Sequence, residues 1–215
     1  MRTVTLVLAI IAILSTAGAA ADEFSIGPWR LGMSKDQVMA FARYQPYATV
    51  AAKHGLETPN GTFLGETRKL TFLFDDGGLS YIQVAEYEGD DFEAAGDGAL
   101  RIFDYFEKNL GGATIDGVDL KEGNAVTRLD HSVLKLLIAQ TLGTAEERAE
   151  QIQRDQGAAM TMVFDMRPVQ QPDGSSLHSQ WGYTSRNKTY FAYLFQDRPT
   201  NPKRGAGSIV SVQKQ

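Results

Sequence analysis

The sequence predicts an α+β fold in which helices cover one face of an antiparallel sheet. Two segments rich in aromatic and β-branched residues, 69–74 and 79–87, are separated by a short turn and predict a β-hairpin. An amphipathic helical pattern follows over 92–110, and strand-like patterning returns over 158–196. Runs of helices followed by runs of antiparallel strands are typical of α+β domains.

The first 21 residues predict a cleavable signal peptide. One positive charge, Arg2, precedes an apolar run over 4–14, and the small residues Ala19-Ala20-Ala21 complete the layout of a secretory signal. The apolar run has about half of the ~20 residues that a membrane-spanning helix needs. We therefore expect no stable membrane anchor after cleavage. The expected location is periplasmic, with an extracellular location as the alternative.

Composition limits the classes of partner and site. The chain has no cysteine, which excludes lipidation at the new N-terminus, disulfides and thiolate metal sites. The signal peptide holds one of the 21 basic residues and none of the 26 acidic ones, so the mature chain is acidic. Its basic residues are scattered, and we expect no nucleic-acid partner. Residues 22–196 are expected to form a single α+β domain and 197–215 a polar tail.

A short helix is predicted from Ser34 to about Arg43. Ser34 and Gln37 have the spacing of a capping box, in which each side chain binds the other residue's free amide. Pro46 stops this helix. Farther along, Asn60-Gly61 is a dipeptide that favours turns, so we expect a turn before the hairpin.

The middle of the chain predicts three helices. Asp90 with Glu93 has capping spacing at the start of the long amphipathic helix. A second helix is expected over 132–142. A third is expected from Thr144 to Gly157, because Thr144 with Glu147 repeats the capping pattern.

The last third of the chain predicts a β-meander. Strands are expected over 158–167, 177–184 and 189–196, with turns between them. Residues 209–212 are apolar enough to add a short edge strand.

One motif invites a catalytic interpretation, and we judge it structural. Ser132-Val133-Leu134-Lys135 has the S-x-x-K spacing of penicillin-binding proteins and serine β-lactamases. The companion segments 185–187 and 188–189 are contiguous rather than separated, and Tyr190 stands where those enzymes have glycine. We expect a helix start with a solvated Lys135, and therefore no enzyme.

Cofactor and metal signatures are also weak. The histidines His54, His131 and His178 are far apart, and none has a second ligand within one helical turn. No Gly-rich loop joins a strand to a helix as a nucleotide site requires. The expected cofactor and metal content is none.

Aromatic residues on the predicted strands are the feature that points to binding. One interpretation is structural: the segment 190–195 is apolar or aromatic on both faces, as expected of a central strand that is covered on both sides. The functional interpretation is a platform on the sheet face opposite the helices, helped by Asp75 and Asp76 in the hairpin turn, since such rings give large contact area at low entropic cost. The aromatic residues assigned to this platform are Tyr81, Tyr87, Trp181, Tyr183, Tyr190 and Tyr193.

Part of the chain resembles a known repeat. The segment 31–38, Pro46 and the segment 70–82 are similar to the helix-then-hairpin repeat of the small outer-membrane assembly lipoproteins and the β-lactamase inhibitory proteins. The resemblance covers about residues 26–87, and the missing lipidation cysteine departs from the lipoprotein branch. The second half repeats the order of helices then strands, so sub-units 22–88 and 89–196 are a further expectation.

The resemblance implies binding of other envelope or secreted proteins rather than catalysis. The leading hypothesis is therefore a non-enzymatic periplasmic protein-binding module, in its more specific form an inhibitor or immunity protein for a secreted or envelope hydrolase. The alternative is a periplasmic small-molecule or lipid-binding protein. An apolar cavity between helices and sheet would favour the alternative, and an aromatic sheet face would favour the leading hypothesis.

Overall fold

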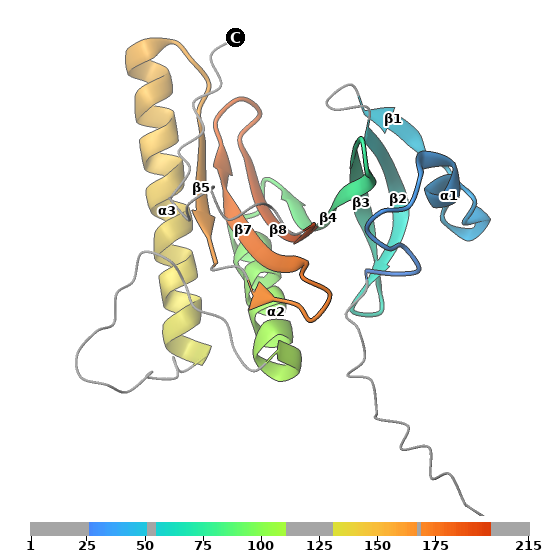
Figure 1. Ribbon diagram of the computed structural model, residues 1–215. Helices are drawn as coiled ribbons and strands as arrows, with labels where there is room; N and C mark the ends of the chain where they lie inside the picture. The colour runs from blue at the N-terminus through green and yellow to red at the C-terminus, as the bar shows by residue number, and fades with distance from the viewer. Residues whose placement is uncertain (1–25, 51–54, 111–130, 167–168, 199–215) are drawn as a thin grey trace, which may run out of the picture.

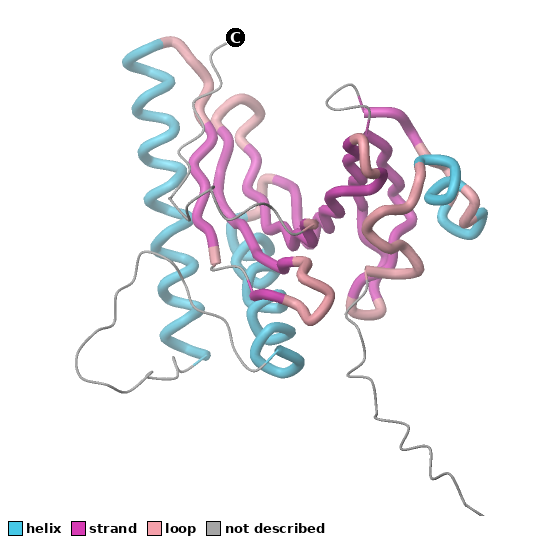
Figure 2. Tube along the Cα trace, viewed as in Figure 1, coloured by secondary structure: helices cyan, strands magenta, loops and turns pink. Residues whose placement is uncertain are grey.

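The computed structural model describes residues 26–50, 55–110, 131–166 and 169–198. Within these ranges eight strands form one antiparallel sheet, accompanied by three α-helices, so the predicted α+β class is confirmed (Figures 1 and 2). The signal peptide, the strand at 209–212 and most of the tail lie outside the described residues. None of the helices in the described part is long and apolar enough to cross a membrane.

The sheet is built from two meanders that meet at its centre. Its order is β1-β2-β3-β4-β8-β7-β5, with β6 beside β7, so β4 and β8, the last strand of each half, pair with each other. The strands are β1 (Ala48–Val50), β2 (Gly55–Phe63), β3 (Glu66–Asp75), β4 (Gly78–Gly89), β5 (Thr161–Asp165), β6 (Val169–Gln170), β7 (Ser176–Thr184) and β8 (Thr189–Asp197).

The helices begin close to where the sequence predicts. They are α1 (Lys35–Met39), the 3-10 helix η1 (Ala42–Tyr44), α2 (Phe92–Leu110) and α3 (His131–Gln156). The capping box is confirmed, because Ser34 N donates to Gln37 Oε1 at 2.8 Å and Gln37 N donates to Ser34 Oγ at 3.2 Å. At α2 the cap is Asp91 rather than Asp90, since its Oδ1 accepts from the amides of the two residues that follow Phe92.

The prediction of two helices between 132 and 157 is wrong, because α3 is continuous. The Thr144 hydroxyl donates to the Gln140 carbonyl inside the helix at 2.9 Å instead of capping a new one. A buried stripe that includes Leu142, Ala145 and Ala149 runs through the expected break. Packing of this stripe outweighs the local capping pattern.

The turn predicted at Asn60-Gly61 is also wrong. Both residues lie within β2, where the pairing with β3 shifts between Thr58 and Gly61. A Cβ on Gly61 would come within 2.2 Å of the Leu70 side chain, so the glycine serves close strand packing. The turn lies instead at Leu64-Gly65, where both residues have positive φ.

The helices α2 and α3 pack on one face of the sheet, and the strand alternation decides which side chains they cover. In β8, Tyr190, Ala192 and Leu194 face α2 and α3, while the intervening residues point to the other side. Near the other end of the sheet, Trp29 packs its ring on Phe72 of β3. In Figure 1, α1 and α3 lie at opposite ends of the molecule, with the sheet between them.

Candidate functional site

Three of the predicted platform residues belong to the core. Trp181 is 2% exposed, and Tyr183 and Tyr190 are also buried, on the face that the helices cover. Their polar atoms bind α3: Trp181 Nε1 donates to Thr141 Oγ1 at 2.8 Å, and the two tyrosine hydroxyls donate to glutamates. The expectation that these residues lie opposite the helices is therefore wrong. Their position in the strand alternation, in phase with Leu194, places them under α3.

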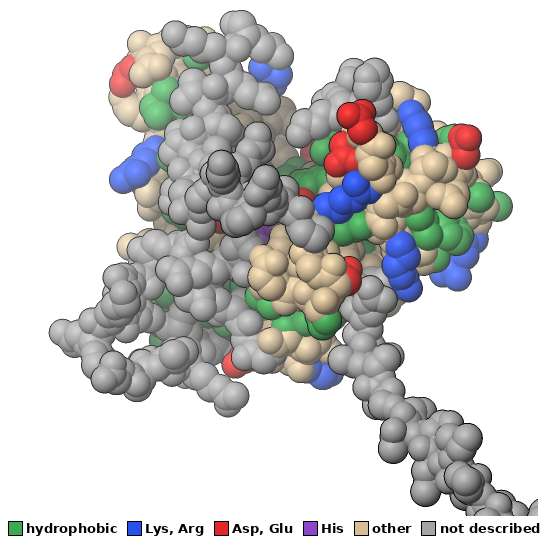
Figure 3. All heavy atoms as spheres, viewed as in Figure 1, with side chains coloured by type: hydrophobic (Ala, Val, Ile, Leu, Met, Phe, Trp, Pro, Cys, Tyr) green, Lys and Arg blue, Asp and Glu red, His purple; other side chains and the backbone are tan. Residues whose placement is uncertain are grey.

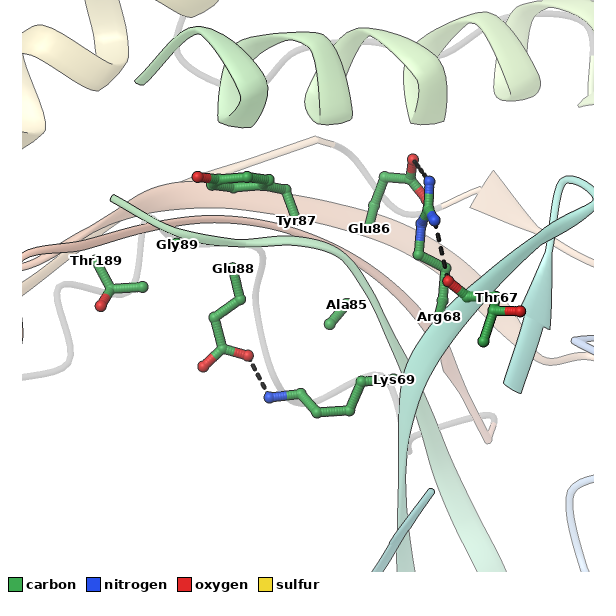
Figure 4. A pocket seen from close by; sticks show the side chains of 9 residues that line it. All are labelled: Thr67, Arg68, Lys69, Ala85, Glu86, Tyr87, Glu88, Gly89 and Thr189. Atoms are coloured by element: carbon green, nitrogen blue, oxygen red, sulfur yellow. Dashed lines mark hydrogen bonds and ion pairs between the residues drawn. The ribbon is translucent and has the colours of Figure 1, made fainter. Parts of the chain in front are cut away.

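Tyr87 also has a structural role. A bulge in β4 between Ala85 and Tyr87 turns the side chains of both Glu86 and Tyr87 toward α2 (Figure 4). The Tyr87 hydroxyl accepts a hydrogen bond from Asp91 N at 2.8 Å, beside the start of α2. The ring thus fixes the junction between β4 and the helix.

The other sheet face carries a cluster of five rings, which we call the helix-free face because none of the described helices packs on it. The Phe195 ring lies 5.3 Å from Tyr81 and stacks on His178 at 4.8 Å, and Phe191 stacks on Tyr193 at 4.8 Å. Phe191 and Phe195 are only 5% and 3% exposed, while the other three rings are partly exposed. The accessible surface is therefore formed by Tyr81, Tyr193 and His178, with the phenylalanines as its support.

Carboxylates border these rings. Asp197 Oδ2 lies 3.2 Å from His178 Nδ1. Burial, with a smaller contribution from Asp197, raises the pKa of Tyr81 well above its usual range. Burial and the Glu88 carboxylate do the same to the pKa of Tyr193. Both phenols therefore stay protonated at neutral pH and can donate hydrogen bonds to a ligand.

A notch opens where β3 and β4 separate. β3 and β4 pair as far as Lys69 and Ala85; beyond that point β3 continues with β2, and β4 continues with β8. The notch has a volume of about 540 Å³ (Figure 4). Since Ala85 pairs with Tyr193, and Glu88 pairs with Phe191, the notch is continuous with the helix-free face.

Ion pairs hold the notch together. Arg68 donates from Nε and Nη2 to the two carboxylate oxygens of Glu86 at 2.9 and 3.0 Å, and from Nη1 to the Thr67 carbonyl. Arg101 of α2 adds a contact of 2.6 Å to Glu86, whose side chain is 1% exposed. The hydrogen bond to Glu86 raises the pKa of Arg68. On the helix-free side Lys69 pairs with Glu88.

The hairpin turn that contains Asp75 and Asp76 is anchored to the rest of the fold. Asp75 Oδ1 accepts from Gly77 N at 2.8 Å and from Arg198 Nη1 at 3.2 Å. The backbone of Gly32 and Met33 exchanges hydrogen bonds with Leu79 on the strand that follows the turn. Asp75 therefore has a structural partner, while the Asp76 side chain is exposed.

A second hollow, of about 420 Å³, lies at the end of the α3 layer. Its tyrosines are the two that anchor α3, with Tyr190 donating to Glu146 at 2.6 Å and Tyr183 donating to Glu150 at 2.7 Å. Asp90 and Lys188 complete its polar lining.

Ser132 and Lys135, the two polar residues of the S-x-x-K motif, are exposed at the start of α3. The Lys135 ammonium lies 3.4 Å from Asp97 Oδ1 of α2. Within the described part of the chain no three His, Asp or Glu side chains are grouped to hold a metal ion. His54 and the side chain of His131 lie outside that part.

The surface and the comparisons give no further assignment. Among the side chains coloured in Figure 3, acidic and basic groups are interspersed over the half that contains α1. Comparisons with protein-family models, curated proteins and solved structures found no match. The sequence reasoning did not assign Phe191, Phe195 and His178 to the aromatic face; the pattern of 190–195, apolar on both strand faces, could have indicated the two phenylalanines.

Proposed function

We propose that this chain is a non-enzymatic protein-binding module of the cell envelope, whose partner is an envelope or secreted protein. The observation that carries the proposal is the ring cluster of the helix-free face, in which Tyr81, Tyr193 and His178 are accessible over Phe191 and Phe195. Tyrosine is enriched at the centres of protein interfaces because it offers area and a hydrogen-bonding group with few rotatable bonds. Export to the periplasm rests on the predicted signal peptide.

The surroundings of the rings support the same proposal. Asp197 lies at one end of the cluster, and the Lys69–Glu88 pair lies at the notch end. An aromatic centre with a charged rim is the usual anatomy of a protein interface. Inhibition of a secreted hydrolase is the more specific form of the proposal, and the resemblance of residues 26–87 to the inhibitory-protein repeat supports it.

Two observations weigh against the small-molecule or lipid alternative. The notch and the hollow beside α3 are lined mainly by charged and polar groups. The layer between helices and sheet is filled by large side chains that are almost fully buried, among them Trp181, Phe106 and Ile102. A lipid chain would need an apolar cavity at that depth.

The test is a capture experiment with the mature chain, residues 22–215, as bait. Envelope and secreted fractions of the producing bacterium are passed over the wild type, over the double variant Tyr81→Ser/Tyr193→Ser, and over the matched control Glu107→Ser/Lys108→Ser on the exposed side of α2. We expect one protein to be retained by the wild type and the control and lost from the double variant. Circular dichroism must show that the double variant is folded.

Two outcomes would refute the proposal. One is equal retention of the captured protein by the folded double variant, which would place binding elsewhere. The other is that nothing specific is retained, while native mass spectrometry of the purified chain shows a bound lipid or small molecule.

A further inference from the structure

The rings of the helix-free face are more buried than side chains on an open sheet face. Side chains stand roughly upright on a sheet, so their neighbours cover their flanks and only a further layer covers their tips. Phe191 and Phe195 are 5% and 3% exposed, as little as residues of the core. Burial also raises the pKa of Tyr81 and Tyr193. The rings therefore require a covering layer, which the described helices do not supply.

One segment outside the described residues is placed to form that layer. Residues 111–130 join α2 to α3, and both of these helices lie on the opposite face. The segments 51–54 and 167–168 are short links between strands, and 22–25 is equally short. Residues 199–215, which we call the C-terminal segment, follow directly after β8, the strand that carries three of the five rings.

Hydrogen bonds fix the start of the C-terminal segment at one end of the ring cluster. Arg198 N donates to the Ser80 carbonyl at 3.0 Å, and the Arg198 side chain binds the turn between β3 and β4. The preceding residue, Asp197, pairs with Tyr81. From there β8 runs about 20 Å back to Phe191. An extended segment of this length spans up to about 55 Å, so it can lie across the whole cluster.

We propose that the C-terminal segment packs on the helix-free face, with the apolar side chains of 209–212 over the rings. Those side chains are Ile209, Val210 and Val212. The segment holds three basic residues and no acidic one, so its charge is opposite in sign to that of the whole chain. The carboxylates of Asp197 and Glu88 border the rings. Apolar residues thus meet the aromatic centre, and basic residues meet the acidic rim.

Docking of the C-terminal segment regulates the proposed binding site, a consequence that rests on the proposed function. The segment covers Tyr81, Tyr193 and His178, the rings that are offered to a partner, so the partner has to displace it. Because segment and face belong to one chain, they meet at an effective concentration on the order of millimolar. The partner therefore binds more weakly while the segment is docked.

Disulfide trapping in the full mature chain, residues 22–215, tests the docking. The chain has no cysteine, so Ser211→Cys with Gln83→Cys supplies its only two thiols. Gln83 lies on the helix-free face, at the position that pairs with Phe195. We expect this pair to form an intramolecular disulfide at least about tenfold faster than Ser211→Cys with Glu107→Cys, on the exposed side of α2. Mass spectrometry of the non-reduced chain measures both rates.

A further substitution tests the apolar contact. Ile209→Asp/Val212→Asp, added to the first cysteine pair, should slow trapping at least about tenfold, because it places carboxylates against the rings. The matched control Val133→Asp/Leu136→Asp, on exposed α3, should leave the rate unchanged. In the capture experiment, the chain with Ile209→Asp/Val212→Asp and no added cysteine should bind the partner at least about tenfold more tightly than the wild type.

The contrary results separate the docking from its consequence. Equal rates for the two cysteine pairs, or a rate that Ile209→Asp/Val212→Asp does not change, show that the segment does not pack on this face. Trapping as expected, with unchanged retention of the partner, shows that docking does not regulate binding. Trapping as expected, with no partner captured by any of the chains, refutes the proposed function and supports the segment as a structural layer over the rings.

Discussion

The two faces of the central strands carry similar aromatic residues and use them differently. On the helix-covered face, the hydroxyls of Tyr183 and Tyr190 bind glutamates of α3 and the rings are buried. On the helix-free face, Tyr81 and Tyr193 contact neighbouring rings and remain partly exposed. Aromatic content alone therefore does not identify a binding surface. The phase of each residue in the strand alternation decides whether its ring stabilises the fold or is available to a ligand.

The largest expected difference between the faces is in the free energy of unfolding that is lost when an aromatic side chain is truncated to alanine. Trp181→Ala removes a fully buried indole and its hydrogen bond to Thr141, and should lower the free energy of unfolding by about 3–5 kcal/mol. Tyr193→Ala, on the helix-free face, should cost less than about 1.5 kcal/mol because its ring is partly exposed. Urea unfolding of both variants measures the difference. Equal losses would contradict the distinction between the faces.

The ion pairs of the notch offer a second comparison across the sheet. Glu86→Ala leaves Arg68 and Arg101 without their shared buried carboxylate and should destabilise the fold by about 3 kcal/mol. Lys69→Ala breaks the pair with Glu88 on the helix-free side, where both side chains are about one-third exposed or more.

For that exposed pair the expected loss is below about 1 kcal/mol. Thermal unfolding in low and high salt separates the two cases, since only the exposed pair should weaken with added salt. If Glu86→Ala is as mild as Lys69→Ala, the buried carboxylate does not hold β3, β4 and α2 together.

Local patterns in the sequence were sufficient to predict most of the elements. The hairpin of β3 and β4, the amphipathic α2 and the capping box at Ser34 are each determined by residues close together in the chain. The continuity of α3 was not predictable in this way, because the buried stripe through Leu142 depends on contacts with distant strands. Tertiary packing outweighs a local capping signal when the two conflict.

The candidate site was predicted only in part, for the same reason. Tyr81 and Tyr193 do lie on the helix-free face, but Trp181 and Tyr190 lie beneath α3. Choosing between the faces requires the register of β8 with both β4 and β7. That register is set by pairing between segments that are distant in the sequence, which the strand pattern alone does not reveal.

Alkaline titration is a property in which the two faces should agree. Burial raises the pKa of Tyr81, Tyr183, Tyr190 and Tyr193 above the ordinary value of 10.0. Above pH 10 the unfolded chain loses these protons while the folded chain keeps them. The stabilisation is therefore complete below pH 10 and is lost as the pH rises through the folded-state values.

The expected slope is about 1.4 kcal/mol per pH unit for each tyrosine that stays protonated. Urea unfolding between pH 8 and 11 measures it, and the double variants Tyr183→Phe/Tyr190→Phe and Tyr81→Phe/Tyr193→Phe should each flatten it. A slope unchanged in one double variant would show that the tyrosines of that face ionise normally.

The smallest expected effect comes from removing single hydroxyls. Tyr190→Phe leaves the ring in place but deprives Glu146 of its donor, and should cost about 1 kcal/mol. Tyr193→Phe removes the hydroxyl of a partly exposed side chain and should change the free energy of unfolding by less than about 0.5 kcal/mol. The same Tyr193→Phe variant should still weaken capture of the proposed partner, because the phenol is a donor on the contact surface. A variant that binds less well without losing stability would assign Tyr193 to recognition and Tyr190 to the fold; the reverse pattern would exchange the roles of the two faces.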